Sequence, residues 1–590
     1  MTVSASFVAS RRVRRTLKPH DPQAARRLAG ELGLPDAAAR VLAARGFEDP
    51  LDARAHLWPV PKSLHDPLLM GGLPEAVERL AATARRGGRV VVFGDYDCDG
   101  VGALAILTTT LKRLGADARP FIPHRLNDGY GLKLPSLLRA LDEHDPEGIV
   151  TVDCGITAVD PIDECVKRGV YVVVTDHHIP PESLPSGAVL VDPKLPGCAY
   201  PYKELCGAGI ALKMADALLA REGPRVGLSD AARDEWRASL AKIAALSTIA
   251  DVVPLTGENR VITAWGLAGL ARPRSPGLAA LLKSSGVPAG RSPSAREVAF
   301  RIAPRLNAAG RIDHAMRSLE LLTTGDAARA LELAESLDKD NTERRQVQER
   351  VVGVVLERLA KTFDAERDAV VIEWGEAEDG WHRGVLGIAA SRVAERVKRP
   401  VLLLSRDGDR VAGSGRTHGR TPLYDRLAPV ARKFRAEFGG HHAALGLSVP
   451  FESFERFREE AREAFSSSRD DEEWVEELSV DTEASAAEVT PELQTALDRF
   501  EPHGHGNPRP LFLFPGLDWD GRGREVGERG LRLRLSDAER RIPLDAVGWT
   551  LGEIPSAERR GRFDVTANVA LDTFTGRPSL TVLHLSRAAS

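Results

Sequence analysis

The first 85 residues place apolar side chains at helical spacing among charged ones. The stretch "DPQAARRLAGELGLPDAAARVLAARG" shows this pattern and is interrupted by Pro35, and "GGLPEAVERLAATARRGG" shows it again. Such spacing is typical of amphipathic helices with one buried face. Neither stretch carries a chemical motif, so residues 1–85 are predicted to form a helical preface.

From Arg89 the pattern changes to short, uninterrupted apolar runs separated by helical stretches. The runs "RVVVF", "GIVTV" and "VYVVV" are rich in β-branched residues, and "VGALAILTTTLKRLG" and "AVDPIDECVKRG" lie between them with helical spacing. Continuous β-branched runs are typical of parallel strands that helices cover on both faces. Residues 86–325 are therefore predicted to form an α/β domain around a parallel sheet, mainly helical after residue 205.

The rest of the chain alternates between helical and strand-like patterns. Residues 326–366 form a long amphipathic run, which is typical of a connecting helix with a solvated charged face. A second α/β domain is predicted for 367–468, ending in a serine-rich and acidic linker, "EAFSSSRDDEEWVEE". Residues 469–590 contain short strand-like runs between glycine-rich turns, a pattern typical of a small OB-like β-barrel. The expected fold class is α/β with this barrel at its end.

The charge pattern restricts where a nucleic acid would bind. The 590 residues carry a net charge of -4, so the chain is not basic throughout and an anionic polymer must meet a local basic surface. Between residues 383 and 435, 13 Lys or Arg residues stand against 4 Asp or Glu residues. Arg416 lies in a glycine-rich turn and is the better candidate for phosphate, whereas Arg396, Lys398 and Arg399 are interpreted as a solvated helix face.

The cysteines and the N-terminus favour a cytoplasmic protein without a membrane anchor. Five cysteines show no CxxC pair, so neither a disulfide framework nor a zinc ribbon is indicated. The N-terminus lacks the apolar core of a signal peptide, and no apolar run approaches membrane length.

Three of the predicted strands end in aspartate. The residues concerned are Asp95, Asp97 and Asp99 in "GDYDCDG", Asp153 in "VDCG", and Asp176, His177 and His178 in "TDHH", with Asp251 following in "ADVVP". One aspartate at a strand end is often the N-cap of the next helix. Several at one sheet edge favour a metal site, because the carboxyl ends of parallel strands meet there. Carboxylates with an imidazole suit Mn²⁺ or Mg²⁺, the histidine favours Mn²⁺, and two ions would offset the repulsion among the carboxylates.

In order and spacing, "DYDCDG", "DCG", "DHH" and "ADVVP" resemble the motifs of the DHH phosphoesterase superfamily. The further motifs "PRLNAAGRIDHA", "WHRGVLGIAASRVAER", "SGRT", "GGHHAALG" and "PHGHGNPRPLF" resemble one family within it, the bacterial single-strand-specific 5′→3′ exonucleases. The resemblance covers nearly the whole chain. It implies a catalytic DHH domain at 86–325 and a DHH-associated substrate-binding domain at 367–468.

The resemblance also implies an activity and partners. The activity would be metal-dependent hydrolysis of single-stranded DNA to 5′-mononucleotides, in DNA repair and recombination. The partners would be single-stranded DNA, a RecQ-type helicase and a single-strand-binding protein. Single-strand preference and 5′ polarity rest on the resemblance alone, because a cleft too narrow for duplex DNA is a property of shape.

Individual residues receive roles from the same resemblance. The metal ligands would be Asp95, Asp97, Asp153, His177 and Asp251, holding two Mn²⁺ or Mg²⁺ ions. His178 would face the scissile phosphate and count with Asp153 as catalytic, and Asp99 would support the reaction from behind the ligands or by capping a helix. The residues expected to bind substrate phosphate are Asn307, Arg311, Arg392, Ser414, Arg416 and His441.

A few positions depart from the family pattern, and none of them is a presumed metal ligand. Cys98 stands where alanine is usual, and Thr417 replaces a common serine. The "HGH" at 503–505 replaces a phenylalanine–glycine–acidic pattern, and His503 and His505 are expected to face solvent in their Gly/Pro-rich loop.

Two other functions remain open at this stage. A DHH phosphodiesterase for short oligoribonucleotides or cyclic dinucleotides would share the metal motifs, but such proteins are generally shorter and lack the terminal barrel. A catalytically inactive scaffold would show eroded ligands, whereas every expected ligand is present. In the barrel, Phe512, Phe514 and Trp519 are either platforms for stacked bases or, in the commoner role, core residues.

Overall fold

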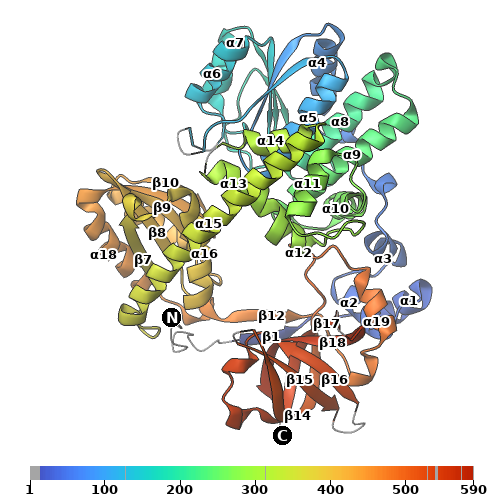
Figure 1. The fold of residues 1–590 in the computed structure, drawn as a ribbon, viewed down its shortest axis with the longest axis vertical. Coiled ribbons are helices and arrows are strands. Elements are labelled where there is room, and N and C mark those ends of the chain that lie inside the picture. The colour runs from blue at the N-terminus through green and yellow to red at the C-terminus, as the bar shows by residue number, and fades with distance from the viewer. Residues whose placement is uncertain are drawn as a thin grey trace. The chain divides into compact units, whose positions relative to one another are not determined.

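The computed structural model describes residues 13–125, 128–129, 131–312, 314–527, 529–537, 542–572 and 575–588 (Figure 1). The side chains of Ile312, His441 and Asp471 lie outside this description. The described residues form two compact units. The larger unit takes in 15–307, 315–334 and the chain after 479, and the smaller unit takes in 13–14, 308–314 and 335–478.

The larger unit contains a parallel sheet with the strand order β3-β2-β4-β5-β6. Its strands are β2 (Arg89–Gly94), β3 (Asp117–Phe121), β4 (Gly148–Val152), β5 (Tyr171–Thr175) and β6 (Ala188–Val191). The register pairs Gly94 with Val152 and Val152 with Thr175, so β2, β4 and β5 end at the same level. The parallel sheet predicted from the β-branched runs is confirmed, and the residues that follow these three strands are neighbours.

Helices cover both faces of this sheet, which explains why its strands are apolar on both sides. On one face, α6 (Leu134–His144) and α7 (Val159–Lys167) share a core with β2, β4 and β5. On the other, α4 (Leu73–Arg85), α5 (Cys98–Arg113) and α8 (Gly207–Glu222) pack against the strands (Figure 1). The helices that follow are α9 (Asp230–Ala250), α10 (Gly257–Leu270), α11 (Pro276–Ser284), α12 (Ala295–Glu297), α13 (Ala303–Ile312) and α14 (Met316–Thr323).

The same unit contains a closed β-barrel. Its strands, in their order around the ring, are β14 (Phe512–Val526), β15 (Gly530–Asp537), β16 (Pro543–Gly548), β18 (Arg577–Arg587) and β17 (Arg560–Asp572), and β14 pairs with β17 to close it. The short strand β13 (Thr482–Glu483) is added beside β14. The expected OB-like barrel is thus confirmed. Phe512, Phe514 and Trp519 are buried in its core, so they pack the barrel and offer no platform for bases.

Three N-terminal helices complete the core of the barrel. Helices α1 (Pro22–Leu32), α2 (Asp36–Ala44) and α3 (Pro50–Leu57) share one apolar cluster with the barrel strands and with α19 (Pro491–Asp498). The predicted helical preface therefore contributes to two cores. Helices α1–α3 pack on the barrel, and α4 packs on the parallel sheet. It also contains a strand, β1 (Val13–Leu17), which pairs with β12 (Glu476–Val480).

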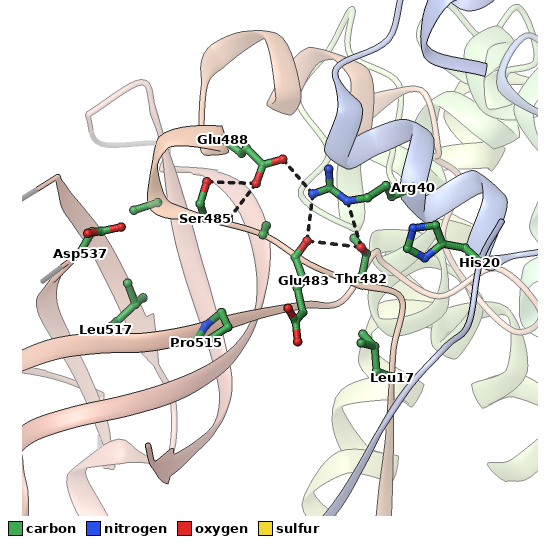
Figure 2. A pocket seen from close by; sticks show the side chains of 12 residues that line it. Leu17, His20, Arg40, Thr482, Glu483, Ser485, Glu488, Pro515, Leu517 and Asp537 are labelled. Atoms are coloured by element: carbon green, nitrogen blue, oxygen red, sulfur yellow. Dashed lines mark hydrogen bonds and ion pairs between the residues drawn. The ribbon is translucent and has the colours of Figure 1, made fainter. Parts of the chain in front are cut away.

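Arg40 on α2 fastens these helices to the barrel. Its guanidinium donates to Thr482 Oγ1 at 3.2 Å, to the Glu483 carbonyl at 2.9 Å and to Glu488 Oε1 at 2.8 Å. The three partners lie at the edge of a cavity of about 520 Å³, and Figure 2 shows the guanidinium pointing toward them.

The smaller unit has a second α/β arrangement. Its sheet, in the order β10-β11-β9-β8-β7, consists of β7 (Val371–Glu376), β8 (Val401–Asp407), β9 (Arg410–Arg416), β10 (Glu437–His441) and β11 (Ala444–Pro450). Its helices are α16 (Arg383–Val397), α17 (Leu423–Lys433) and α18 (Phe451–Ser467). The amphipathic run before them is one continuous helix, α15 (Ala327–Thr362).

The start of the predicted serine-rich linker is wrong. Phe454, Phe457 and Phe465 are buried along one face of α18, and this packing carries the helix through the serines to Ser467. Tertiary packing of α18 therefore outweighs the lower intrinsic helix propensity of the serines. Among the described residues, none of the helices is both long enough and apolar enough to cross a membrane.

Candidate metal centre

The aspartate motifs meet at the end of the parallel sheet. Asp97 is the N-cap of α5, where its carboxylate accepts hydrogen bonds from Asp99 N at 2.9 Å and Gly100 N at 3.0 Å. Asp95 is buried beside it, and Asp153 is buried after β4 with a left-handed backbone (φ 60°). A left-handed residue other than glycine is uncommon, and strained positions of this kind cluster at functional sites.

His177 lies at the centre of a group of carboxylates. Its Nε2 atom is 3.0 Å from Asp153 Oδ1, 3.7 Å from Asp251 Oδ2 and 3.8 Å from Asp99 Oδ2. Asp251 reaches this group as the C-cap of α9. The imidazole is neutral and ready to act as a ligand, because burial and the neighbouring His178 lower the pKa of His177 to about 3.

Three sets of side chains each bring their ligand atoms within 4.8 Å of one another. The sets are Asp95 with Asp97 and Asp153, Asp99 with His177 and Asp251, and Asp153 with His177 and His178. All five residues expected to be metal ligands are therefore brought together. Asp153 and His177 each belong to two of these sets.

Asp99 has a structural role that can be stated from its contacts. Its carboxylate accepts hydrogen bonds from Gly207 N at 2.6 Å and Ala208 N at 2.9 Å, at the start of α8. Asp99 therefore caps a helix, but one that begins more than a hundred residues later in the chain. Burial and the charge of Asp97 raise the pKa of Asp99 to about 6.

Asp176 orients His178, and it belongs to none of the three ligand sets found among the described residues. Its Oδ1 accepts from His178 Nδ1 at 2.7 Å and from His177 N at 2.8 Å, and its Oδ2 accepts from Ile156 N at 2.9 Å. Burial alone would raise the pKa of Asp176, but these hydrogen bonds hold it below its usual value. Burial lowers the pKa of His178, but its bond to Asp176 outweighs this and raises it overall.

The unpaired atoms in the centre fit a divalent cation. Buried atoms that make no hydrogen bond within the described residues include Asp95 Oδ1, Asp153 Oδ1, Asp251 Oδ2 and both ring nitrogens of His177. Although His177 Nε2 lies close to Asp153, the geometry is not that of a hydrogen bond. Burial and the neighbouring carboxylates raise the pKa of Asp95 and Asp153 well above their usual values and that of Asp251 to about 9. Bound cations would compensate this repulsion, and oxygen donors with one imidazole suit Mn²⁺ or Mg²⁺.

Sequence reasoning missed several residues that hold these ligands in place. Ser247 Oγ donates to the Cys98 carbonyl at 2.9 Å, and the Arg125 guanidinium lies 4.6 Å from the Tyr96 ring centroid. Gly207 lies directly against Asp153. The only signal for the last contact was the small-residue run "CGAG" at 206–209, which is typical of a close backbone approach.

We expect Gly207→Ala to lower kcat about 100-fold, because small displacements of catalytic groups have effects of this size. A Cβ at position 207 would lie 2.6 Å from Asp153 Cβ and 2.9 Å from its Cγ, so the carboxylate must move. The matched control is Gly209→Ala on the same helix, whose Cβ would meet no atom closer than 3.3 Å. Steady-state kinetics of both variants at saturating Mn²⁺ test this, and equal activity of the two would contradict it.

Asn307, on α13, contacts the first aspartate motif. Its Oδ1 accepts a hydrogen bond from Cys98 N at 2.7 Å, in the first turn of α5. This oxygen is therefore used structurally, and any contact with substrate phosphate falls to the NH₂ group of Asn307.

The other predicted phosphate-binding residues lie in the smaller unit. A Cβ on Gly387 of α16 would lie 2.8 Å from Arg416 NH2 and 3.4 Å from Ser414 Oγ, so both side chains border the first turns of that helix. Arg311 donates to the Gly384 carbonyl at 3.0 Å in the same region. Arg392 is exposed further along α16, and the side chain of His441 lies outside the described residues.

Fewer basic side chains between residues 383 and 435 are available to bind phosphate than the composition of this stretch indicates. Arg426 pairs with Glu473 at 2.7 Å and Lys433 with Glu460 at 2.6 Å. Arg399, expected to be solvated, is buried and lies 3.6 Å from the Trp474 ring centroid, because its stem packs while its guanidinium finds backbone carbonyls. The available positive charge is correspondingly smaller than the count predicts.

The "HGH" loop also differs in part from expectation. His505 is exposed as predicted, but His503 is half-buried. Burial and the nearby Arg509 lower the pKa of His503 to about 3, so it is neutral. The loop is packed inside the larger unit through its backbone, where the His505 carbonyl accepts from Leu255 N at 2.7 Å, and residue types alone do not reveal this.

Comparisons with known proteins agree with this geometry. Three family profiles match the chain: the DHH family N-terminal domain at residues 89–248, the DHHA1 domain at 367–467 and the RecJ OB domain at 480–584. The single-stranded-DNA-specific exonuclease RecJ of Dickeya dadantii is 32% identical over 587 residues, which cover 95% of this chain and 98% of that protein. The protein of the same description from Thermus thermophilus is 36% identical over 490 residues, covering 82% and 67% of the two chains.

Solved structures give the same result. The crystal structure of RecJ from Thermus thermophilus in complex with Mn²⁺ superposes with a TM-score of 0.80 at 30% identity, covering 98% of this chain and 80% of that chain. The corresponding Mg²⁺ complex gives a TM-score of 0.75 at 29% identity, covering 98% and 79%.

Proposed function

Because the chain belongs to the RecJ family of single-stranded-DNA-specific exonucleases, we propose that it shortens single-stranded DNA from the 5′ end and releases 5′-mononucleotides. The reaction is the metal-dependent hydrolysis of a phosphodiester bond. The observation that carries the proposal is the convergence of unpaired carboxylate and imidazole atoms at the ends of β2, β4 and β5.

The metal site and His178 have different tasks in the proposed hydrolysis. When bound, two Mn²⁺ or Mg²⁺ ions supply a nucleophile at neutral pH and neutralise charge on the phosphoryl group. Asp95, Asp97, Asp153, His177 and Asp251 would hold them. The bond that breaks joins phosphorus to the 3′-oxygen, and the oxygen of a water molecule becomes bonded to phosphorus. Because His178 Nδ1 is engaged by Asp176, donation of a proton to the leaving 3′-oxygen falls to its Nε2 atom.

Side chains in each of the two units are proposed to bind substrate phosphate. Arg311, Ser414 and Arg416 border the first turns of α16, where a guanidinium can form paired hydrogen bonds with phosphate oxygens. Asn307, Arg392 and His441 are proposed as further phosphate contacts. None of these contacts reads a base, so binding should not depend on DNA sequence.

Two specific features disfavour the other candidate functions. A phosphodiesterase for dinucleotides has no use for the closed barrel after residue 480, and an inactive scaffold would not retain all five proposed ligands, four of which carry buried atoms without a hydrogen bond in the described residues. A RecQ-type helicase and a single-strand-binding protein are proposed partners in DNA repair and recombination, in the cytoplasm.

The test uses one oligonucleotide labelled either at its 5′ terminus or at its 3′ end. With Mn²⁺, the 5′ label should appear at once as a mononucleotide, whereas the 3′ label should pass through a ladder of shortening fragments. Immediate release of the 3′-terminal nucleotide would refute the polarity. Cleavage confined to di- and trinucleotides would favour the small-substrate phosphodiesterase, and salt-sensitive binding without cleavage would favour the scaffold.

A further inference from the structure

Three buried polar residues occupy the first turn of α10, shortly after the segment that carries Asp251. Glu258, Asn259 and Arg260 are each at most 2% exposed. Successive residues of a helix point about 100° apart, so the three side chains must reach different neighbours. Glu258 pairs with Lys213 at 2.5 Å within the helical layer, whereas Arg260 reaches out of it.

Arg260 joins α10 to the loop between α19 and the barrel strand β14. Its Nε donates to the His56 carbonyl at 2.6 Å, and its two NH₂ groups donate to the carbonyls of Arg499, Phe500 and Glu501 at 2.9 Å each. Every acceptor that it uses in the described part of the chain is a backbone carbonyl. Burial and the charge of Arg45 lower the pKa of Arg260 to about 10, so it remains charged at neutral pH.

The carbonyls of Arg499, Phe500 and Glu501 belong to the loop 499–508, which is held by hydrogen bonds of its own. Asn507 Nδ2 donates to the carbonyls of Phe500 at 2.8 Å and Pro502 at 2.9 Å, and Asn507 Oδ1 accepts from Arg45 NH1 at 2.9 Å. Asn507 itself is buried. The loop is therefore a rigid element between α19 and β14, and its position is set by Arg260 on one side and Arg45 on another.

The same loop contacts the segment that follows Asp251. Leu255 N donates to the His505 carbonyl at 2.7 Å, and Asn259 Nδ2 donates to the Pro254 carbonyl at 3.1 Å. Between these points and Asp251 stands Val252, a β-branched residue with φ 60° and an exposed side chain. A valine does not hold this conformation by itself, so the surrounding contacts must impose it.

We propose that Arg260 is a positioning residue, which acts through the loop 499–508 to fix the segment Asp251–Leu255 and thereby the carboxylate of Asp251 in the metal centre. The proposal rests on the proposed function, since it assigns to the barrel loop a part in holding a metal ligand. The barrel then contributes to the hydrolysis itself, in addition to any contact with DNA.

The test compares Arg260→Met with Arg40→Met in the full-length protein. Both arginines fasten other elements to the barrel region through several hydrogen bonds, but the partners of Arg40 lie around β13 (Figure 2) and do not include the segment 251–260. The readouts are the Kd for Mn²⁺ of the chelator-treated protein, from electron paramagnetic resonance of free Mn²⁺, and kcat and KM on single-stranded DNA. Thermal unfolding shows whether each variant is folded.

Arg260→Met should raise the Mn²⁺ Kd about 10-fold and lower kcat, with the KM for DNA changed by less than about 2-fold, because outer partners of metal ligands have effects of this order. Arg260→Lys should recover part of the loss, and Arg40→Met should leave both constants unchanged. A folded Arg260→Met with the Mn²⁺ Kd of the parent protein would overturn the proposal.

A second variant covers the case in which Arg260→Met does not fold. Gly506→Ala leaves Arg260 in place and adds a methyl group 2.9 Å from Pro254 Cβ, so it should weaken Mn²⁺ binding in the same direction. Unchanged Mn²⁺ binding by that variant would also overturn the proposal. If the parent protein binds Mn²⁺ but cleaves no DNA, while these variants bind Mn²⁺ more weakly, the proposed function fails and the positioning role stands.

Discussion

Asp153→Asn is expected to lower exonuclease activity by more than about 100-fold, since losses of about 10–100-fold already follow changes to the outer partners of metal ligands. Asp153 belongs to two of the three ligand sets, so its loss affects both of those sets. Asparagine keeps the shape of the side chain and tolerates the left-handed backbone at this position, so the loss would come from the missing charge. Initial rates on 5′-labelled single-stranded DNA over a range of Mn²⁺ concentrations measure it.

The thermal unfolding temperature shows whether the loss of activity in Asp153→Asn comes from misfolding. Without metal, burial and the surrounding carboxylates disfavour the charged form of Asp153, so the neutral asparagine should unfold at a higher temperature than the parent protein. The matched control is Asp142→Asn, which removes a carboxylate that is exposed on α6 and paired with Arg168. An Asp153→Asn protein with the parent's activity, or a control with the same loss, would remove Asp153 from the reaction.

His178→Gln is expected to reduce kcat by about 100–10,000-fold, the usual range for a group that transfers a proton in the transition state. The imidazole is held by Asp176 and lies beside the metal centre, with its ring centroid 4.5 Å from that of His177. Glutamine can replace the hydrogen bond to Asp176 but cannot deliver a proton. The measurement is the single-turnover rate at saturating enzyme and Mn²⁺, which isolates the chemical step from DNA binding.

A substrate with a different leaving group distinguishes a role of His178 in proton donation from a role in metal binding. A substrate with sulfur in place of the scissile 3′-oxygen needs no proton on departure, so it should be cleaved by His178→Gln at nearly the rate of the parent protein. Asp176→Asn should show a smaller loss, because His178 remains but is less firmly oriented. A weakened Mn²⁺ Kd in His178→Gln, with no rescue by the sulfur substrate, would make His178 a ligand instead.

The clustering of the proposed metal ligands could be predicted from sequence, because the positions of the strand ends largely determine it. Once "RVVVF", "GIVTV" and "VYVVV" are recognised as parallel strands, the aspartates after them must share one edge, and the register confirms that β2, β4 and β5 end together. The terminal barrel was predictable for the same reason, since alternating short strands with glycine-rich turns have few other solutions. Asp251 was grouped with these residues from its place in "ADVVP", but its role as a ligand was implied by the family resemblance, because nothing in its own helix points to the sheet.

The residues that hold the ligands could not be predicted. Asp99 caps α8 by accepting hydrogen bonds from Gly207 N and Ala208 N. Such a contact depends on how elements that are distant in sequence pack together. Within the described residues, the acceptors of Arg260 are backbone carbonyls, which every residue possesses and which therefore leave no trace in the sequence. The expectation for Arg399 was wrong for a related reason, because an arginine that packs on an aromatic ring looks like a surface residue until the position of that ring, here Trp474, is known.

The shared core of α1–α3 and the barrel also determines how this protein must be made. Leu28, Leu42 and Leu57 pack against residues such as Phe500 and Phe514, and the whole of the sheet domain and the smaller unit is synthesised between them. At ordinary elongation rates the N-terminal helices leave the ribosome tens of seconds before their partners, on the order of 20–90 s. Throughout that interval their apolar faces are available to chaperones, proteases and other nascent chains. These helices are translated before the sheet domain but are thus among the last elements to reach their native packing, and a chain that terminates before the barrel leaves them without a core.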